Sequence, residues 1–471
     1  MRIFLTSCLL FLYTGLFGQH YLEKERLAID DSLEIALFQI KDSLFTPGKT
    51  FVWDQQEYIL HKKDSLYTLN LKNTTTKYTA YNTAFALMQI NAPNGIVNEP
   101  KRMSRIQYAD SAKTRVNHAG IELRGNSSQL FSKKSYDINF HKDSLGLENK
   151  NVRLGTMRKD DDWILDALYN EPLRLRSYLS FALWKKIHTP SYLDKAPKAR
   201  SGINSQYCEL FINNRYKGIY LLTEQVDRKL LKLVKEDSTG VRGELFQGSA
   251  YQGAVTFDSL PPKKNYLRRW GGYDIKYPYP NNIPWNNLYD FTNTVIHGDK
   301  TAFAKAVNTQ LNLSNIIDYF LFINALRAPD NLGKNVYLAR YDKDEPYFYV
   351  PWDLDGTFGT IFSGQELDIT TDFLDNGLLR RLLVENPENF TERFKSRWKE
   401  LRVDVLKTET LLQWQKENYQ KLLASGVYER EKIAWESLDY SSLRIEYMTS
   451  WTQKRLLFLD NYIENLIPKT D

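Results

Sequence analysis

The segment 324–359, NALRAPDNLGKNVYLARYDKDEPYFYVPWDLDGTFG, constrains this chain more than any other. It contains Asp330, then Asn335 five residues later, and then Asp353 and Asp355 after two aromatic strands, NVYLARY and YFYVPW. We expect these strands to pair as a hairpin that brings the first three polar residues to one corner. Each acidic motif alone is also typical of a turn. Together they are the oxygen ligands and the orienting carboxylate that a phosphoryl-transfer site with Mg²⁺ requires.

Length and composition are those of a globular protein with more than one subdomain. The chain has 471 residues, of which 42% are hydrophobic and 25% charged, with 30 Tyr, 24 Phe and 10 Trp. These values predict two or three packed subdomains with ample buried aromatic area. The net charge is only +6 and the basic residues are dispersed, which argues against a nucleic-acid polymer as a partner. After the N-terminus, no apolar run is long enough to cross a membrane.

The N-terminal residues predict a secretory signal peptide. Arg2 supplies a positive n-region, residues 3–13 a short apolar core, and residues 14–18 an exit of small residues. A buried hydrophobic helix is the alternative, and a lipoprotein signal at Cys8 is disfavoured because too little apolar sequence precedes it. Removal of the signal leaves Cys208 as the only cysteine, so no intramolecular disulfide is expected. We therefore expect a secreted, periplasmic or cell-surface protein without a membrane span after signal removal.

Residues 19–83 are expected to form an accessory segment without chemistry of its own. Apolar residues in 22–40 have near-helical spacing, and 51–71 alternates like short strands. The polar tract 73–79 is typical of a linker. Strand patterns then dominate from residue 84 onward.

A polar loop between two predicted strands, GNSSQLFSKK at 125–134, is a candidate phosphate-binding loop. The strand before it ends at Arg124, and the strand after it opens with a lysine. Backbone N–H groups and one ammonium group in such a loop can bind phosphates, although an ordinary hairpin has the same pattern. Period-two alternation puts Lys134 on the apolar face with Tyr136 and puts Lys133 on the opposite face. We therefore expect Lys134 to be the phosphate ligand.

The remaining pattern predicts strands first and helices later. A helix is expected at 173–187, with Glu171 and Arg176 near its start, either facing a cleft or serving as capping and surface charges. Strands at 206–213 and 216–223 form a predicted hairpin.

The segment after this hairpin passes from strand to helix. The junction from Glu224 to Val226 suits a connection between two lobes, although any such junction has this appearance. Residues 243–279 indicate irregular or edge-strand structure that covers a substrate surface. Helices are predicted at 288–307, at 316–326 and over most of 377–466. The pattern predicts an α+β protein with two lobes.

The order of the polar residues in 324–359 is the order found in protein kinases. There a catalytic-loop Asp is followed at +5 by a metal-binding Asn, then a hairpin, then a second metal-binding Asp. The usual spellings are absent: Arg-Ala-Pro-Asp stands in place of His-Arg-Asp, Trp-Asp-Leu-Asp stands in place of Asp-Phe-Gly, and no G-x-G-x-x-G occurs. The chain instead resembles the spore-coat-protein-H (CotH) type of secreted kinases, atypical members of the kinase-like superfamily. Five stretches carry the resemblance in the family's order: LRGNSSQLFSKKSYDINF, YNEPLRLRSYLSFALWKK, CELFINNRYKGIYLLTEQVD, NALRAPDNLGKNVYLARY and YFYVPWDLDGTFG.

This resemblance spans roughly residue 84 to the C-terminus and implies a fold and an activity. The implied fold is a compact kinase-like one, and the implied activity is transfer of the ATP γ-phosphate to Ser or Thr of extracytoplasmic proteins with Mg²⁺ or Mn²⁺. By position, the resemblance implies Asp330 as the catalytic base and Asn335 and Asp353 as metal ligands. Asp355 is similar to the second acid of the family's Asp-x-Asp and is a further candidate metal ligand.

On the nucleotide side, the resemblance implies Lys134 as the lysine that contacts the phosphates and takes part in the transfer. Arg124 is a further candidate cofactor-binding residue. The backbone from Glu224 to Val226 is similar to the adenine-side hinge. Glu171 is the candidate carboxylate that pairs with Lys134.

Two other functions compete with this interpretation. One is a non-catalytic surface or matrix-binding protein on the same scaffold, because ATP is scarce outside the cytoplasm and the aromatic-rich loops suit polymers or partner proteins. The other is a metal-dependent glycosyltransferase that uses Asp353 and Asp355, which would leave Asp330 and Asn335 unexplained. The expected parts are a signal peptide (1–18), an accessory segment (19–83), a β-rich N-lobe (84–225) and a mainly helical C-lobe (226–471).

Overall fold

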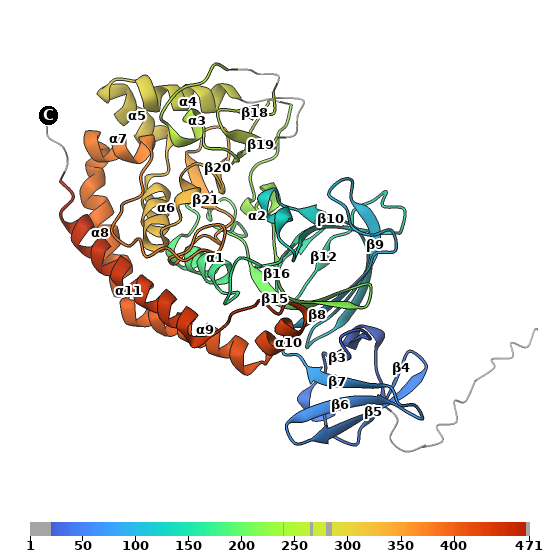
Figure 1. Ribbon diagram of the computed structural model, residues 1–471. Coiled ribbons are helices and arrows are strands. Elements are labelled where there is room, and N and C mark those ends of the chain that lie inside the picture. The colour runs from blue at the N-terminus through green and yellow to red at the C-terminus, as the bar shows by residue number, and fades with distance from the viewer. Residues whose placement is uncertain (1–19, 239, 264–266, 279–284, 468–471) are drawn as a thin grey trace, which may run out of the picture. The chain divides into compact units, whose positions relative to one another are not determined.

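The computed structural model describes residues 20–238, 240–263, 267–278 and 285–467 (Figure 1). The predicted signal peptide therefore lies outside the described residues. The chain divides into two compact units. The smaller unit comprises Met1–Pro93, Arg105–Asn117 and Glu209–Lys217, and the larger unit comprises Asn94–Ser104, His118–Cys208 and Gly218–Asp471.

A seven-stranded sheet with its own apolar core occupies the start of the smaller unit. Its strand order is β1-β4-β5-β6-β7-β3-β2. Leu27, Phe38, Leu60 and Leu69 are among the fully buried members of its core. The strands are β1 (His20–Tyr21), β2 (Leu27–Asp30), β3 (Ile35–Phe38), β4 (Thr50–Trp53), β5 (Gln56–Lys63), β6 (Leu66–Leu71) and β7 (Lys77–Asn82).

The strands predicted within 51–71 are confirmed, but the helical spacing in 22–40 was misleading. That stretch forms the antiparallel pair β2–β3 instead. The Asp30 carboxylate accepts hydrogen bonds from the backbone N–H groups of Ser32 and Leu33, and this local turn reverses the chain where a helix would have to continue. The tract 73–79 is not wholly a linker, because strand β7 begins within it.

Seven further strands form a closed barrel in the order β10-β11-β14-β16-β15-β8-β9, and the division between the two units runs through its strands. The predicted hairpin at 206–223 is confirmed, and its turn residues Asn213 and Asn214 both have positive φ, as a two-residue turn between twisted strands requires. A short pair, β12 (Val152–Arg153) and β13 (Lys159–Asp160), forms a separate two-stranded sheet. The barrel strands are β8 (Ala86–Asn91), β9 (Arg102–Ala109), β10 (Thr114–Arg124), β11 (Ser135–His141), β14 (Asp162–Asp166), β15 (Ser205–Ile212) and β16 (Arg215–Thr223).

Residues 243–279 were expected to be irregular or edge-strand structure, but in the larger unit they contribute strands to a five-stranded sheet. Its order is β18-β19-β17-β20-β21, so β17 lies at its centre and pairs with both β19 and β20. The Gly- and Pro-rich sequence hid this strand because its neighbours come from distant parts of the chain. The strands are β17 (Glu244–Gly248), β18 (Arg269–Trp270), β19 (Tyr273–Tyr277), β20 (Val336–Arg340) and β21 (Tyr347–Pro351).

Helices make up most of the rest of the larger unit (Figure 1). The predicted helix at 288–307 is two helices, because the chain breaks at Gly298 and Asp299 caps the second helix through the backbone N–H of Ala302. The helical pattern over 377–466 is interrupted at Pro387 and Gly426, since both residues lie between α-helices. The helices are α1 (Arg176–Ile187), α2 (Arg228–Leu231), α3 (Gly253–Thr256), α4 (Trp285–His297), α5 (Lys300–Gln310), α6 (Leu313–Leu326), α7 (Gly377–Glu385), α8 (Phe390–Val403), α9 (Thr408–Ala424), α10 (Val427–Ala434) and α11 (Ser442–Glu464).

Helix α6 is the buried centre of this helical part. Nearly every one of its residues is buried, and it packs against α1, α8, α11 and strand β21. It ends at Leu326, and the chain then enters the acidic segment. The larger unit thus combines sheets with a helical body, which confirms the α+β class.

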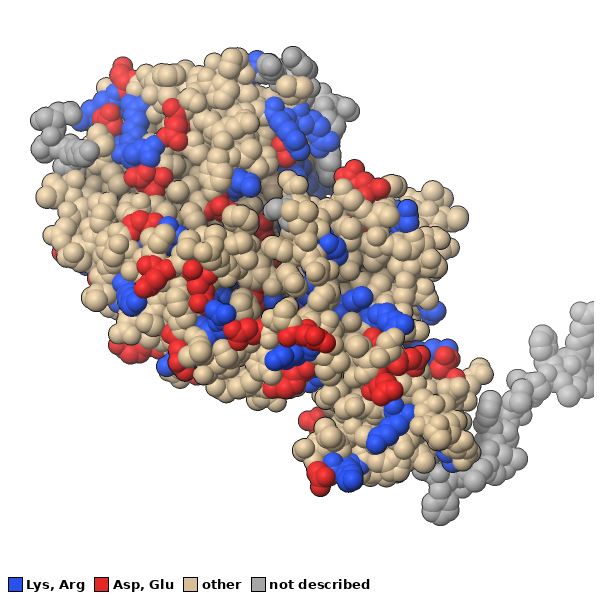
Figure 2. All heavy atoms as spheres, viewed as in Figure 1, with Lys and Arg blue, Asp and Glu red and all other residues tan. Residues whose placement is uncertain are grey.

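Two observations bear on partners. In the part of the chain that the structure describes, no helix combines the length and the apolar character that a membrane span needs. On the face shown in Figure 2, basic and acidic side chains are interspersed and form no extended patch of one sign.

Candidate active site

The hairpin formed by β20 and β21 brings the two predicted acidic motifs together. Val336 pairs with Pro351 at one end of this hairpin, and the backbone N–H of Trp352 donates to the carbonyl of Asn335 at 2.9 Å. Asn335 and Asp353 therefore flank the last rung of the ladder at the same end. The hairpin expected from the sequence is confirmed.

A buried asparagine ties the two motifs to each other. The side-chain amide of Asn331 donates to the carbonyl of Asn335 at 2.6 Å and to the carbonyl of Trp352 at 2.9 Å. The Tyr319 hydroxyl of α6 donates to the Asn331 carbonyl at 2.6 Å. Asn331, which the sequence indicated only as a turn former, thus fixes the 3₁₀ turn η4 (Pro329–Leu332) that carries Asp330 against the hairpin end.

Two of the three predicted metal ligands lie in a strained backbone conformation. Asn335 has φ of 53° and Asp353 has φ of 52°, values in the left-handed region that non-glycine residues seldom adopt. Among the described residues, neither side chain has a hydrogen-bond or ion-pair partner in the protein. Strain of this kind is concentrated at functional sites, where the surrounding structure holds a side chain in a required direction.

Four carboxylates interact electrostatically at this corner, and we call Asp166, Asp330, Asp353 and Asp355 the acidic cluster. Burial, together with the charges of Asp166 and Asp330, raises the pKa of Asp353. Burial and the charge of Asp353 raise the pKa of Asp355 well above its usual value. In the described part of the chain, none of the four carboxylates forms an ion pair with a basic side chain.

Hydrogen bonds orient three members of the acidic cluster. Asp355 accepts from the side-chain amide of Asn170, and Asp330 accepts from the Tyr251 hydroxyl at 3.0 Å. Asp166, the last residue of β14, accepts from the Ser135 hydroxyl at 3.3 Å. The sequence prediction did not include Asp166, Asn170 or Tyr251. A carboxylate that ends the apolar strand DWILD is the one signal by which Asp166 could have been found.

Arg124 lies beside the acidic cluster, as its position at the end of the strand before the polar loop suggested. Its guanidinium group lies 5.4 Å from the centre of the Trp352 ring. Its positive charge lowers the pKa of Asp353 against the larger effect of burial. Arg124 is therefore placed to contact an anion that is bound next to Asp353.

The two lysines of the polar loop occupy different surroundings from those predicted. Strand β11 begins only at Ser135, so the alternation that favoured Lys134 does not extend to it. Lys133 is the buried lysine; its ammonium group pairs with Glu431 of α10 at 2.5 Å, and burial lowers its pKa to about 8. Lys134 is half-buried and donates to the carbonyls of Gln129 and Phe131 at the base of the loop. The role of Lys134 at the phosphates stays a prediction.

Glu171 does not pair with Lys134 in this structure. Its carboxylate is fully buried and accepts from the backbone N–H and the hydroxyl of Ser177 in the first turn of α1. Burial raises its pKa to about 7. Of the two roles that the sequence left open for Glu171, capping of the helix is the observed one. The carboxylate that pairs with a lysine of the polar loop is Glu431, which contacts Lys133 and also pairs with Arg174 at 3.2 Å.

The predicted hinge from Glu224 to Val226 follows β16 directly. The Glu224 carboxylate is buried and accepts from Arg200 at 2.9 Å and from the backbone N–H groups of Arg158 and Asn204. This side chain therefore stabilises the loops around the hinge. Val226 is also buried, and the adenine contact of this backbone stays a prediction.

A second acidic group, Asp160 to Asp162, differs from the acidic cluster because its charges are neutralised. Ligand oxygens of these three residues lie within 4.8 Å of one another, and among the described residues only this group is so tight. Lys229 pairs with Asp161 at 2.6 Å and also with Asp160, and Arg158 pairs with Asp160. The acidic cluster is more open and lacks such partners.

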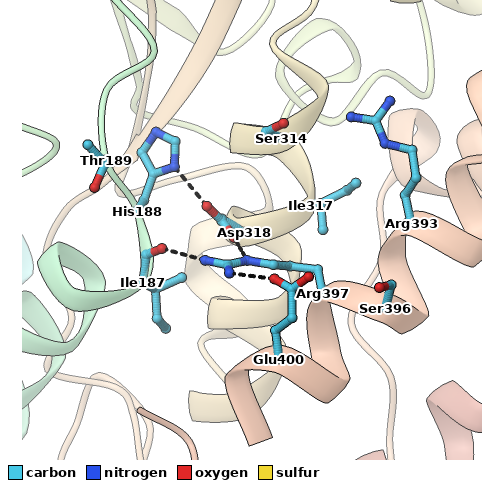
Figure 3. Close-up of a pocket in the computed structure, with 10 residues that line it drawn as sticks. All are labelled: Ile187, His188, Thr189, Ser314, Ile317, Asp318, Arg393, Ser396, Arg397 and Glu400. Carbon is cyan, nitrogen blue, oxygen red and sulfur yellow. Dashed lines mark hydrogen bonds and ion pairs between the residues drawn. The ribbon is translucent and has the colours of Figure 1, made fainter. Parts of the chain in front are cut away.

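A separate cavity of about 480 Å³ lies between α1, α6 and α8 and contains none of the predicted site residues (Figure 3). Asp318 lies at its centre; one carboxylate oxygen contacts His188 at 2.9 Å and the other accepts from Arg397 at 2.7 Å. Arg397 pairs with both Asp318 and Glu400, which indicates a structural network. The lining residues are Ile187, His188, Thr189, Ser314, Ile317, Asp318, Arg393, Ser396, Arg397 and Glu400.

The family model described as CotH kinase protein matches residues 121–459, well over half of the chain and including every residue of the acidic cluster. The chain belongs to the CotH kinase family. The inner spore coat protein H of Bacillus subtilis (strain 168) is 23% identical over 274 residues. That match covers 56% of this chain and 66% of the relative, so the chain spans just under two thirds of the relative's length. Family membership thus supports the sequence resemblance.

Proposed function

We propose that this protein is an extracytoplasmic protein kinase that transfers the γ-phosphate of ATP to Ser or Thr hydroxyls of exported proteins. The observation that carries this proposal is the corner at the end of the β20–β21 hairpin. There Asn335 and Asp353 lie at the same end of the hairpin, their side-chain oxygens have no partner among the described residues, and Asp330 lies close enough for its charge to affect Asp353. This arrangement has the parts of a phosphoryl-transfer site on a chain of the CotH kinase family.

The acidic cluster fits a divalent cation. Half-buried carboxylates that repel one another and have no ion-pair partner among the described residues are stabilised by a cation, which lowers their pKa values. Asn335, Asp353 and Asp355 would hold Mg²⁺ or Mn²⁺, and the bound ion would neutralise the charge on the nucleotide phosphates. We further propose a two-lobed kinase-like arrangement of the matched region, with the nucleotide between the barrel strands and the β20–β21 hairpin.

Asp330 is the proposed general base. In the transfer, the acceptor hydroxyl oxygen forms a bond to the γ-phosphorus while the bond from that phosphorus to the β–γ bridging oxygen breaks. The hydroxyl proton passes to the Asp330 carboxylate, and ADP leaves. Asp330 is only partly buried, so an acceptor side chain can approach it from solvent.

The nucleotide phosphates are proposed to contact Arg124 and Lys134. Arg124 is already beside Asp353. The Lys134 ammonium group has three N–H donors and uses two of them on backbone carbonyls, so one donor is left for a phosphate oxygen. We propose that the backbone of residues 224–226 contacts the adenine.

The proposed compartment is outside the cytoplasm. The N-terminal residues have the composition of a secretory signal. The relative from Bacillus subtilis is named as an inner spore coat protein, which is consistent with a surface location.

Transfer of labelled phosphate tests the activity. The mature chain is incubated with γ-labelled ATP, Mg²⁺ and a generic acceptor protein rich in Ser and Thr. Loss of a general base costs about 10²- to 10⁴-fold in rate, so Asp330→Asn should reduce incorporation by that factor. The same change at Asp64, an exposed turn residue of the smaller unit, should leave incorporation unchanged.

Three outcomes would contradict the proposal. Equal incorporation by the wild-type protein and by Asp330→Asn would remove the assigned base. Stabilisation by a nucleotide sugar with Mn²⁺, without any by ATP, would indicate the glycosyltransferase instead. Binding of neither nucleotide would favour a non-catalytic interaction protein.

A further inference from the structure

A tyrosine outside the acidic segment contacts the proposed base. The Tyr251 hydroxyl lies 3.0 Å from Oδ1 of Asp330 and 3.0 Å from the carbonyl oxygen of Pro329. Both distances are within the range of an O–H···O hydrogen bond. Among the described residues, Tyr251 is the only side chain that donates a hydrogen bond to the Asp330 carboxylate.

The fold holds this tyrosine in place from two sides. The backbone N–H of Ser249, between β17 and Tyr251, donates to the carbonyl of Gly272 at 2.9 Å. The Tyr251 ring lies directly on Gly333, where an added Cβ atom would come within 2.8 Å of its Cδ1 atom. Gly333 follows η4, so the glycine permits the ring to reach the carboxylate only three residues away.

The contact gives the two carboxylate oxygens of Asp330 different surroundings. Oδ1 faces the Tyr251 hydroxyl, which leaves Oδ2 to accept the proton of an incoming hydroxyl. Burial and the Asp330 charge raise the pKa of Tyr251, so the phenol stays protonated and can donate at neutral pH.

We propose that Tyr251 is a positioning residue for the reaction: it fixes the rotamer of Asp330, so that Oδ2 faces the acceptor. This proposal rests on the proposed kinase function. Tyr251 is 49% exposed, so its ring also forms part of the surface that an acceptor protein meets next to the base.

The test uses Tyr251→Phe, which keeps the ring on Gly333 and removes only the hydroxyl. A hydrogen bond to a charged group corresponds to roughly a 10-fold to 100-fold effect, so we expect kcat to fall by about 10-fold while KM for ATP changes less than twofold. A merely structural role would raise KM for ATP as well, so the split between kcat and KM separates the two roles.

A double-mutant cycle tests whether the Tyr251 hydroxyl affects the rate through Asp330. Because the hydroxyl acts through the Asp330 carboxylate, Tyr251→Phe should change the residual rate of Asp330→Asn by less than twofold. Tyr78→Phe is the matched control, since the Tyr78 hydroxyl donates to Asp31 at 2.8 Å in the smaller unit. This variant should leave the rate unchanged.

The outcomes separate the two proposals. A wild-type rate in Tyr251→Phe, with active transfer by the wild-type protein, would overturn the role of Tyr251 alone. An equal fall in rate with and without the Asp330 carboxylate would also overturn it. Absence of any phosphate transfer by the wild-type protein would overturn the kinase function and the role of Tyr251 with it.

Discussion

The two clusters of charged residues in the larger unit differ in how their charges are balanced. At the hairpin end, the four carboxylates of the acidic cluster have no ion-pair partner among the described residues, and burial raises the pKa of Asp353 and of Asp355. At the polar loop, Lys133, Glu431 and Arg174 form a fully buried network in which each charge has a partner. A balanced buried network is structural, whereas an unbalanced one is stabilised only by a ligand of opposite charge.

The buried network should have the largest effect on stability when its common partner is lost. Glu431→Gln leaves Lys133 and Arg174 buried without a counter-charge, and breaking a buried ion pair costs about 3–5 kcal/mol. We expect the free energy of unfolding in urea to fall by about that amount. Glu148→Gln is the control because Glu148 pairs with Lys142 in an exposed position, and it should leave the midpoint unchanged. Equal midpoints for the two variants would show that the buried network is not structural.

Loss of a charge from the acidic cluster should instead raise the stability of the protein. Asp353→Asn removes one of the mutually repelling carboxylates, so the metal-free protein should become more stable by about 1 kcal/mol, as is common when a functional site is neutralised. Thermal unfolding in EDTA measures this change. A lower melting temperature than wild type would mean that the Asp353 carboxylate already has a stabilising role without a ligand.

The same repulsion predicts a dependence on pH. The pKa values of Asp353 and Asp355 are raised in the folded state, so between the usual Asp pKa of 3.8 and the raised values the folded chain binds more protons than the unfolded chain. Stability of the metal-free protein should therefore fall as pH rises through this window. Stabilisation by Mg²⁺ should be larger at about pH 7.5 than at about pH 5, because only ionised carboxylates bind the ion. Equal stabilisation at both pH values would place the metal elsewhere.

Of these substitutions, that of Lys134 should have the smallest effect on stability and on activity. Its ammonium group contacts only the carbonyls of its own loop, so Lys134→Met should scarcely change the unfolding midpoint. Its proposed contact with a phosphate predicts a rise of about threefold to tenfold in KM for ATP, as expected for one partly solvated charge-assisted hydrogen bond. An unchanged KM would remove Lys134 from the nucleotide site and leave Arg124 as the candidate.

These two clusters also show what the sequence could reveal. Asn335 and Asp353 were predictable because a single hairpin places them, and the pairing of β20 with β21 depends on residues only a few positions apart. The partner of Lys133 was not predictable in this way, since Glu431 lies 298 residues away in the sequence. Tyr251 is likewise 79 residues from Asp330, and nothing local in its loop indicates that contact.

Local patterns failed where a turn or a strand boundary decided the outcome. The apolar spacing at 22–40 suits a helix, but the Asp30 turn divides it into two strands. The alternation that selected Lys134 assumed that the strand includes this lysine, but strand β11 begins one residue later, at Ser135. Central strand β17 escaped prediction because its sequence lacks the apolar run of a buried strand and its partners β19 and β20 are distant.

Binding of Mg²⁺ and ATP tests the central claim most directly. The melting temperature of the mature protein is measured with Mg²⁺ alone, with ATP alone and with both, for wild type, Asp353→Asn and the control Asp64→Asn. A ligand at about 100 times its Kd stabilises a protein by about 2.7 kcal/mol, so wild type and Asp64→Asn should show a clear rise with both ligands present. We predict that Asp353→Asn loses this rise. The same rise in all three proteins would contradict the assignment of the acidic cluster as the metal–nucleotide site.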